Sequence, residues 1–397
     1  MITKLRLKNF RSIDEQTLDI GPITILYGAT SSGKSTLLYS LYVIRNFILN
    51  PNQASDGLFN LAFLNLGGFE ACVREHDLTK EITIAPTFET PSGGTGHYSL
   101  ELSRASAKLQ QSASDVQLNA AITMPYALNQ NFQFPYKGRT GEFNINWNGI
   151  TCNVAPVAPT AEGQAEAVEI TARVNSIVEE IKAIDICPQR RGFFKTTFNP
   201  TQPTPIIYSE DEVGSLIIND QNLASRISTD LNDICNRDFR HFVVPGTATA
   251  FFKTTEKNAR VPVDLVNDGF GVNQVIYMLA KLHRSDVRTV LIEEPEIHLH
   301  PSLIASFAQT LARIVKEDKK QCIFATHSEQ FVVSVLGCVA DGVLSPEDVR
   351  CYHVIKEKRV TEYKNQKVSQ NGQIEGGLAS FIEAELKNLK KFVATAQ

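Results

Sequence analysis

Residues 23–35 read ITILYGATSSGKS, and this stretch decides the fold. Ile23 to Tyr27 is a short β-branched and aromatic run, which predicts a strand. Gly28 to Ser35 then fits the pattern G-x-x-x-x-G-K-[ST]. From Lys34 to about Leu49 apolar residues recur at helical spacing, at Leu37, Leu38, Leu41, Ile44 and Ile48. A strand, a glycine loop and a helix in this order predict the start of an α/β nucleotide-binding unit.

The residue types of this loop suit a phosphate group. Glycines let backbone N–H groups curl around phosphate oxygens, and the helix N-terminus adds partial positive charge. We expect Lys34 to reach the β- and γ-phosphates of ATP, and the Ser35 hydroxyl to ligate Mg²⁺. A Gly/Ser loop that happens to precede a lysine is the alternative, and the flanking strand and helix argue against it. The nucleotide-binding residues predicted here are Gly28, Ala29, Thr30, Ser31, Ser32, Gly33, Lys34, Ser35 and Thr36.

A second chemical pattern is VRTVLIEEPE at residues 287–296. An apolar run that ends in carboxylates is typical of a buried parallel strand. Beside a phosphate loop, we assign Glu293 to the metal ion and Glu294 to the general base that takes a proton from the attacking water. The alternative is a strand that simply ends in solvated acidic residues.

A third pattern is CIFATHS at residues 322–328. His327 follows another apolar strand, from which it can hydrogen-bond the γ-phosphate or the attacking water, and we assign it a catalytic role. A histidine before a helix capped by Ser328 is a compatible interpretation. His298 and His300 lack a third and fourth zinc ligand at the usual spacing, so we expect no structural zinc.

The rest of the chain predicts an inserted lobe and a run of helices. Short strands separated by turn residues span 81–150, which indicates an antiparallel lobe within the α/β frame. Within it, the Ser-, Gln- and Ala-rich segment 105–120 is interpreted as a helix or a mobile loop. In the tail, apolar residues at helical spacing over 378–393 predict a docked C-terminal helix in preference to one that binds a partner. Further helices are expected at 162–181, 222–236, 272–283, 302–316 and 329–336.

Composition excludes several classes of protein. With 397 residues, 43% of them hydrophobic, the chain can form a large core and is not disordered overall. A net charge of −4 argues against a globally basic nucleic-acid binder. Seven cysteines without a CxxC pair favour a reducing cytosol. Because no apolar stretch is long enough to span a bilayer and the N-terminus does not resemble a secretory signal, we expect a cytoplasmic protein without membrane contact.

Together these motifs resemble the ABC-type ATPase head of RecF, SMC proteins and the overcoming-lysogenization-defect (OLD) family. The run LIEEPEIHLHP at 291–301 is the most specific part, being similar to the Walker B and D-loop run of OLD- and RecF-like ATPases. The loop at 28–36 matches Walker A, and 325–328 resembles the switch-histidine loop. Other similar segments are the N-F-R-S opening at 9–12, the degenerate signature motif at 267–274 and the turn PQRRG at 188–192, with an arginine that approaches the site.

The resemblance implies an α/β fold of the P-loop NTPase class, an ABC-ATPase head with a mixed sheet and an inserted antiparallel β-rich lobe. The expected divisions are an N-terminal part of the head at 1–80, the inserted lobe at 81–185, a C-terminal part of the head at 186–345 and a strand-turn-helix extension at 346–397. No long heptad run separates the two parts of the head, and no Asp-x-Asp pair follows Ser328, so we expect neither a long coiled coil nor a Toprim nuclease domain.

The resemblance also implies a partner. Two heads would form a head-to-tail homodimer with ATP between them, in which Arg11 lies near the nucleotide and Gly269, Gly271 and Asn273 contact the γ-phosphate in trans. Departures from the family pattern predict slow hydrolysis: Asn273 replaces the signature Ser, Glu293 the usual Asp and Thr30 the Walker A Asn, and the Q-loop Gln is absent at 65–70.

The resulting hypothesis is a Mg²⁺-dependent switch ATPase in DNA maintenance or antiphage defence. The alternative is a nucleotide sensor or scaffold that does not hydrolyse ATP and gates a partner effector, a nuclease or a toxin. A transporter ATPase subunit is disfavoured by the EEPE run and the degenerate signature. DNA binding is a further possibility, through a basic patch of Arg190, Arg191, Lys195, Arg237 and Arg240, against the simpler interpretation of scattered surface charge.

Overall fold

The computed structural model describes residues 1–90, 94–202, 204–375 and 377–378. The tail helix expected over 378–393 therefore lies outside the described residues, apart from Leu378. The chain divides into two compact units. The first comprises residues 1–20, 36–185 and 357–362, and the second 21–35, 186–356 and the chain from 363 onward. Within the part described, no helix is both long and apolar enough to cross a membrane.

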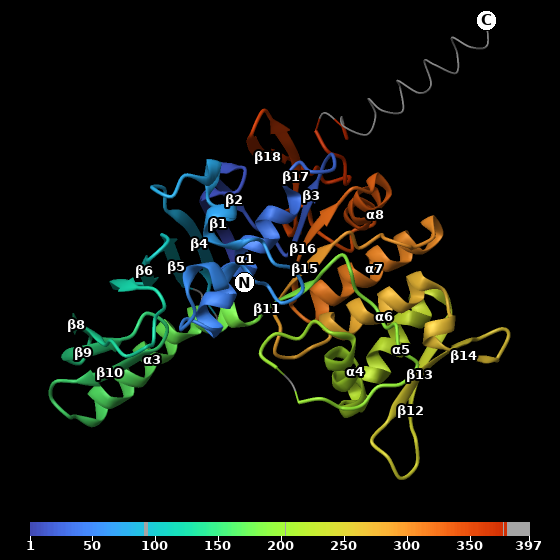
Figure 1. Cartoon of the computed structure of the whole chain (residues 1–397), viewed down its shortest axis with the longest axis horizontal. Helices are drawn as coiled ribbons and strands as arrows, with labels where there is room; N and C mark the ends of the chain where they lie inside the picture. Colours follow the sequence, from blue (N-terminus) through green and yellow to red (C-terminus); the bar gives the residue numbers. More distant parts are fainter. Residues whose placement is uncertain (91–93, 203, 376, 379–397) are drawn as a thin grey trace, which may run out of the picture. The chain divides into compact units, whose positions relative to one another are not determined.

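The second unit is built on a six-stranded sheet in the order β11-β15-β16-β3-β17-β18 (Figure 1). Its four central strands run parallel, with β16 between β15 and β3. This places the ends of the predicted strands 23–27, 287–293 and 322–325 at one edge of the sheet. The strands are β3 (Ile23–Tyr27), β11 (Ile184–Cys187), β15 (Thr289–Glu293), β16 (Gln321–Thr326), β17 (Val349–Glu357) and β18 (Val360–Gln366).

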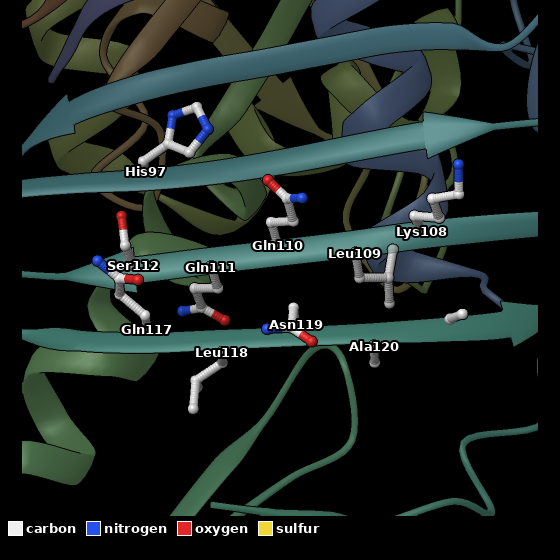
Figure 2. Close-up of a pocket in the computed structure, with 11 residues that line it drawn as sticks. His97, Lys108, Leu109, Gln110, Gln111, Ser112, Gln117, Leu118, Asn119 and Ala120 are labelled. Atoms are coloured by element: carbon white, nitrogen blue, oxygen red, sulfur yellow. The ribbon is translucent and has the colours of Figure 1, made fainter.

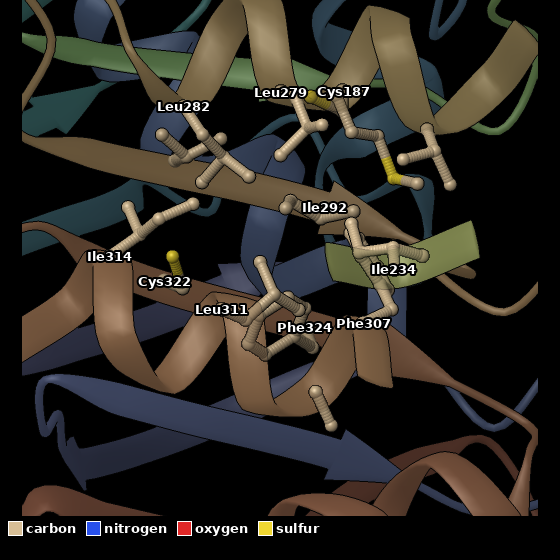
Figure 3. Packing of buried hydrophobic residues seen from close by; sticks show 14 of the residues in the cluster. Cys187, Ile234, Leu279, Leu282, Ile292, Phe307, Leu311, Ile314, Cys322 and Phe324 are labelled. Atoms are coloured by element: carbon tan, nitrogen blue, oxygen red, sulfur yellow. The ribbon is translucent and has the colours of Figure 1, made fainter. Parts of the chain in front are cut away.

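Helices pack around this sheet and close its core. In Figure 3, Leu279 and Leu282 of α6 and Leu311 of α7 lie beside Ile292 of β15 and Phe324 of β16, all fully or almost fully buried. The predicted helices are present as α5, α6, α7 and α8, whereas α4 and the small sheet β12-β13-β14 were not anticipated. These elements are α4 (Glu210–Asn219), α5 (Gln221–Cys235), α6 (Phe270–Leu282), α7 (Pro301–Glu317), α8 (Glu329–Ala340), β12 (Arg237–Val243), β13 (Ala250–Glu256) and β14 (Pro262–Asp264), with short 3₁₀ turns at Leu265–Asn267 and Pro346–Asp348.

The first unit contains the antiparallel lobe. This unit contains a six-stranded sheet in the order β2-β1-β4-β5-β6-β7, a three-stranded sheet in the order β10-β9-β8, and the helices α1, α2 and α3. Its elements are β1 (Ile2–Phe10), β2 (Ile13–Asp19), α1 (Lys34–Leu49), α2 (Gly68–Cys72), β4 (Ile82–Glu89), β5 (Thr95–Leu102), β6 (Ser106–Ala113), β7 (Val116–Thr123), β8 (Phe132–Lys137), β9 (Glu142–Trp147), β10 (Cys152–Pro156) and α3 (Ala161–Lys182), with 3₁₀ turns at Ser55–Phe59 and Arg74–His76.

The interpretation of residues 105–120 as a helix or mobile loop is wrong, because this segment forms β6 and the start of β7. Burial alternates along β6, and Gln111 occupies one of the buried positions. Its side-chain amide donates to the Val174 carbonyl at 2.6 Å and accepts from the Trp147 indole N–H at 3.0 Å. A glutamine with both polar groups bonded can be buried like an apolar residue. The polar residue type therefore hides the alternation of buried and exposed positions that would have indicated a strand.

The outer face of β5, β6 and β7 carries a shallow hollow of about 480 Å³ (Figure 2). Its polar lining consists mainly of neutral amide and hydroxyl groups from Gln110, Ser112, Gln117 and Asn119, with His97 at one end and Lys108 at the other. None of the predicted site residues lines this hollow.

Candidate nucleotide-binding site

The turn between β3 and α1 has the backbone shape that a phosphate loop needs. Gly28, Ser31 and Gly33 have φ values of 148°, 62° and 109°. A Cβ atom at Gly28 would lie 2.3 Å from the Val354 carbonyl oxygen of β17, so only glycine fits there. Successive turn conformations of this kind direct backbone N–H groups toward one point, where they can bind an anion.

Lys34 opens α1 and points its ammonium group back into this turn. Its Nζ donates to the carbonyl oxygens of Gly28 at 2.9 Å and Ala29 at 2.8 Å, and lies 3.1 Å from Nδ1 of His327. Burial lowers the pKa of Lys34 to about 8, against the opposing effect of the carboxylates of Glu294 and Glu296. The ammonium group is therefore bonded within the loop, and a bound phosphate would replace its neutral carbonyl partners with anionic oxygens.

Glu294 and His327 complete a chain of contacts that begins at Lys34. Oε1 of Glu294 lies 3.2 Å from Nε2 of His327, and Oε2 accepts from the Gln189 side-chain amide at 2.8 Å. Glu294 itself has φ 43°, a left-handed conformation, and its backbone N–H donates to the Ala325 carbonyl at 2.7 Å. Glu294 and His327 follow the neighbouring parallel strands β15 and β16, and Lys34 follows β3 through the glycine loop, so the three side chains meet at one edge of the sheet.

Glu293 and Ser35 are the two residues predicted from the sequence to hold a magnesium ion. The Glu293 side chain is buried, and Oε2 accepts from the Gln189 backbone N–H at 3.3 Å. Ser35 lies in the first turn of α1, directly after Lys34. A carboxylate and a hydroxyl are hard oxygen donors of the type that Mg²⁺ prefers, so the donor set fits this ion. Thr36 follows in the same turn and is buried.

Two side chains hold this edge of the sheet, the buried Arg191 and the half-buried Glu296, and no motif in the sequence pointed to their contacts. Arg191 is 2% exposed, and its guanidinium donates to the carbonyl oxygens of Pro188 at 2.9 Å, Glu293 at 2.6 Å and Glu294 at 2.7 Å. Oε1 of Glu296 accepts from the Thr326 hydroxyl at 2.7 Å and from the N–H groups of His327 and Ser328, both at 3.1 Å. Glu296 therefore fixes the loop that carries His327.

The five basic residues considered for a DNA-binding patch differ in their surroundings. Arg191 is buried beneath the site, Lys195 pairs with Asp211 at 2.5 Å and Arg237 pairs with Asp268 at 3.1 Å. Only Arg190 and Arg240 of the five remain exposed without such a role in the described structure. These contacts fit the simpler interpretation of scattered surface charge, because residue type alone does not reveal which cations satisfy buried carbonyls or neighbouring carboxylates.

The last strands of the sheet also support the phosphate loop. The Tyr363 hydroxyl of β18 donates to the Gly33 carbonyl at 2.8 Å. His353 of β17 stacks on Tyr27, the residue before the loop, with ring centroids 5.1 Å apart. No motif in the sequence pointed to these supports, since each depends on sheet pairing between distant segments.

The signature segment has a different character. Asn273 is buried, and its side chain accepts from the Phe193 N–H and donates to the Phe193 carbonyl, both at 2.7 Å. The geometry therefore does not offer this amide to a nucleotide in trans, contrary to expectation. A Cβ at Gly271 would meet the His298 carbonyl at 2.4 Å, whereas Gly269 faces open space.

The remaining predicted residues make other contacts. Arg11 belongs to the first unit, in the turn between β1 and β2, where its backbone N–H donates to the Cys72 carbonyl at 2.6 Å. Residues 65–70 belong to the first unit as well. His298 packs edge-on against Phe270, and His300 caps α7.

The fold and the loop define an α/β ATPase head of the SMC and ABC type. An SMC head solved in complex with the C-winged helix domain of ScpA has a TM-score of 0.51 and 10% identity, over 93% of this chain and 98% of that one. A second, the SMC head domain from Thermotoga maritima, has a TM-score of 0.43 and 13% identity, over 92% and 98%. The first likeness shows the fold and confirms the predicted fold class.

The chain belongs to the AAA ATPase domain family, whose sequence profile matches residues 1–332. It is also 22% identical over 345 residues to an OLD nuclease from Thermus scotoductus, covering 83% of this chain. The matched region spans 60% of the length of that nuclease.

Proposed function

We propose that this chain is a Mg²⁺-dependent ATPase that binds and slowly hydrolyses ATP and acts as a switch. The observation that carries the proposal is the line of contacts from Lys34 through His327 to Glu294, with separations of 3.1 and 3.2 Å. A cation, an imidazole and a carboxylate next to a phosphate-binding turn are the groups that phosphoryl transfer to water requires.

Each side chain has a distinct task. Lys34 exchanges its carbonyl partners for phosphate oxygens. Glu294 accepts the proton of the attacking water at Oε1, and His327 orients that water from the adjacent position. Ser35 and Glu293 would hold Mg²⁺, which would supply neutralisation of phosphate charge. Arg191 and Glu296 keep the two acidic residues and the histidine in place through backbone contacts.

A homodimer through ATP is part of the proposal. Gly269 lies at the N-terminus of α6, exposed and with no neighbour within 4 Å of a Cβ built there. This open helix start can face the phosphates bound by a second copy. We assign Asn273 a positioning role, since its contacts with Phe193 hold the first turn of α6, and leave the contact in trans to the backbone near Gly269.

The test separates binding from turnover. Lys34→Ala should lose nucleotide affinity by about 100-fold, because it removes charge-assisted hydrogen bonds to the phosphates. Glu294→Gln should bind ATP with unchanged affinity, release phosphate at least about 100-fold more slowly, and accumulate as an ATP-bound dimer. The exposed Glu317→Gln is the matched control. Titration with ATP, phosphate release and light scattering are measured on all variants; normal turnover in Glu294→Gln would exclude it as the base.

One observation favours a second candidate, a nucleotide sensor that does not hydrolyse ATP and gates a partner effector. The amide of Gln189 occupies Oε2 of the proposed base at 2.8 Å, and Asn273 is engaged inside its own chain. Tight ATP binding without phosphate release would favour this candidate. For either candidate, the likeness to an OLD nuclease supports a setting in DNA maintenance or antiphage defence.

A further inference from the structure

An apolar groove of about 430 Å³ lies on the second unit along the C-terminal half of α8. Its floor includes Val333, Gly337 and Ala340, which share one face of that helix at i, i+4 and i+7. Val333 is 50% exposed, and a Cβ built at Gly337 would meet nothing within 4 Å. Among the described residues, no charged side chain lines the groove.

The opposite wall is a well-fixed turn of the chain after β18. Gly372 has φ 69° and lies so close to α8 that a Cβ would come within 2.2 Å of the Leu336 carbonyl. Val368 and Ile374 form a β-bridge across the turn, and the Gly377 N–H donates to the Ile374 carbonyl at 3.0 Å. These contacts deliver the chain to the groove at Leu378, which lines it and is 8% exposed.

We propose that this groove is the docking site of the chain's own C-terminal segment. The next residues carry an apolar stripe at helical spacing, formed by Phe381, Ile382, Leu386, Leu389 and Val393. Ser380, Ala384 and Lys387 fall on the opposite side of the same helical projection, whereas Glu385 falls between Phe381 and Leu389. An uncharged, apolar groove matches the stripe and would cover Val333, which is otherwise exposed.

Attachment favours this occupant over a separate molecule. Because Leu378 already lines the groove, Phe381 and Ile382 are only three and four residues away along the chain. A tethered segment binds at a high effective concentration, so modest apolar contact is sufficient. Docking of the segment in this groove requires neither ATP nor the proposed catalytic residues.

Lysines in the segment allow a test on the full chain without added labels. Lys387, Lys390 and Lys391 are trypsin sites, and the exposed sites at Lys257 and Arg260 report protease activity in the same sample. Phe381→Asp with Ile382→Asp removes the apolar stripe, and Ser380→Asp with Ala384→Asp makes the same change of charge on the other side. Gly337→Glu fills the groove with a charged side chain, while Gly337→Ala adds one methyl group; both residues favour a helix more than glycine does.

Cleavage at Lys387, Lys390 and Lys391, followed by mass spectrometry, decides the proposal. We expect cleavage at least 10-fold slower in the wild type, the Ser380/Ala384 variant and Gly337→Ala than in the Phe381/Ile382 variant and Gly337→Glu, at every protein concentration. Equal rates in all variants would overturn docking. If cleavage responded to the tail substitutions but not to Gly337→Glu, the segment would dock elsewhere and this groove would be excluded as its site. Protection that appears only at high protein concentration would mean that a second copy supplies the segment.

Discussion

The phosphate loop and the signature segment look alike in sequence but are built in opposite ways. Both are glycine-containing segments that include the start of a helix, at residues 28–35 and 267–274. In the loop, position 28 requires glycine because a side chain would collide with the Val354 carbonyl. The ammonium group of Lys34 contacts the His327 ring. In the signature segment, the Asn273 side chain is used to hold Phe193, and Gly269 faces open space.

The phosphate loop and the signature segment therefore contribute to the proposed site by different means. The loop end gathers side-chain chemistry from three strands within one chain, and buried contacts maintain it. In the signature segment, the Asn273 side chain is bonded within its own chain, and only the backbone near Gly269 faces open space. The loop end should therefore be sensitive to changes in buried polar groups, and the signature end to changes in backbone position.

The largest effect is expected from Arg191→Ala. The substitution leaves three buried carbonyl oxygens, those of Pro188, Glu293 and Glu294, without their cationic donor. We expect a loss of about 3–5 kcal/mol in the free energy of unfolding and complete loss of phosphate release. Urea unfolding followed by far-UV circular dichroism measures the first, with the exposed neighbour Arg190→Ala as control. Equal stabilities for the two variants would show that the loop end does not depend on its buried cation.

The next largest effect on stability is expected from Asn273→Ser, which restores the residue usual in the family signature. A serine is too short to bond both the N–H and the carbonyl of Phe193, so the free energy of unfolding should fall by about 2–3 kcal/mol. Phosphate release should not rise. Asn267→Ser, in the turn before the helix, serves as control. A faster ATPase with unchanged stability would restore the expected role in trans and remove the contrast between the two segments.

Gly271→Ala and Gly269→Ala separate backbone packing from exposure within the signature segment. The added methyl at 271 would collide with the His298 carbonyl, so α6 must shift; we expect a loss of about 1–2 kcal/mol and weaker ATP-dependent dimerisation. The methyl at 269 meets no atom, and stability should change by less than about 0.5 kcal/mol. Analytical ultracentrifugation with ATP and thermal unfolding compare the two. Indistinguishable variants would mean that the His298 contact does not set the position of the helix.

Much of the structure next to the phosphate loop could be predicted from sequence because its signals are local. The strand at Ile23–Tyr27, the helix from Lys34 and the acidic strand end each show their period or motif within about ten residues. Glu296 gave no such signal, since its role appears only when β15 and β16 lie side by side. The interpretation of residues 105–120 as a helix or mobile loop was wrong for a related reason, because the hydrogen-bond partners that allow Gln111 to be buried are more than 30 residues away.

The smallest effect is expected from Tyr363→Phe, which tests the outer support of the loop. The variant keeps the ring and removes only the hydroxyl that donates to the Gly33 carbonyl at 2.8 Å. One lost hydrogen bond at a partly buried site corresponds to about 1 kcal/mol, or about a fivefold weaker affinity if the bond holds the loop in its binding shape. Tyr136→Phe, in the first unit, removes a hydroxyl bonded to Asp115 and should leave nucleotide affinity unchanged. Calorimetric titration of both variants with ATP makes the comparison. If Tyr363→Phe lowered stability and affinity no more than Tyr136→Phe did, the backbone of the loop would be rigid without β18, and the loop end would owe its shape to Gly28 and Lys34 alone.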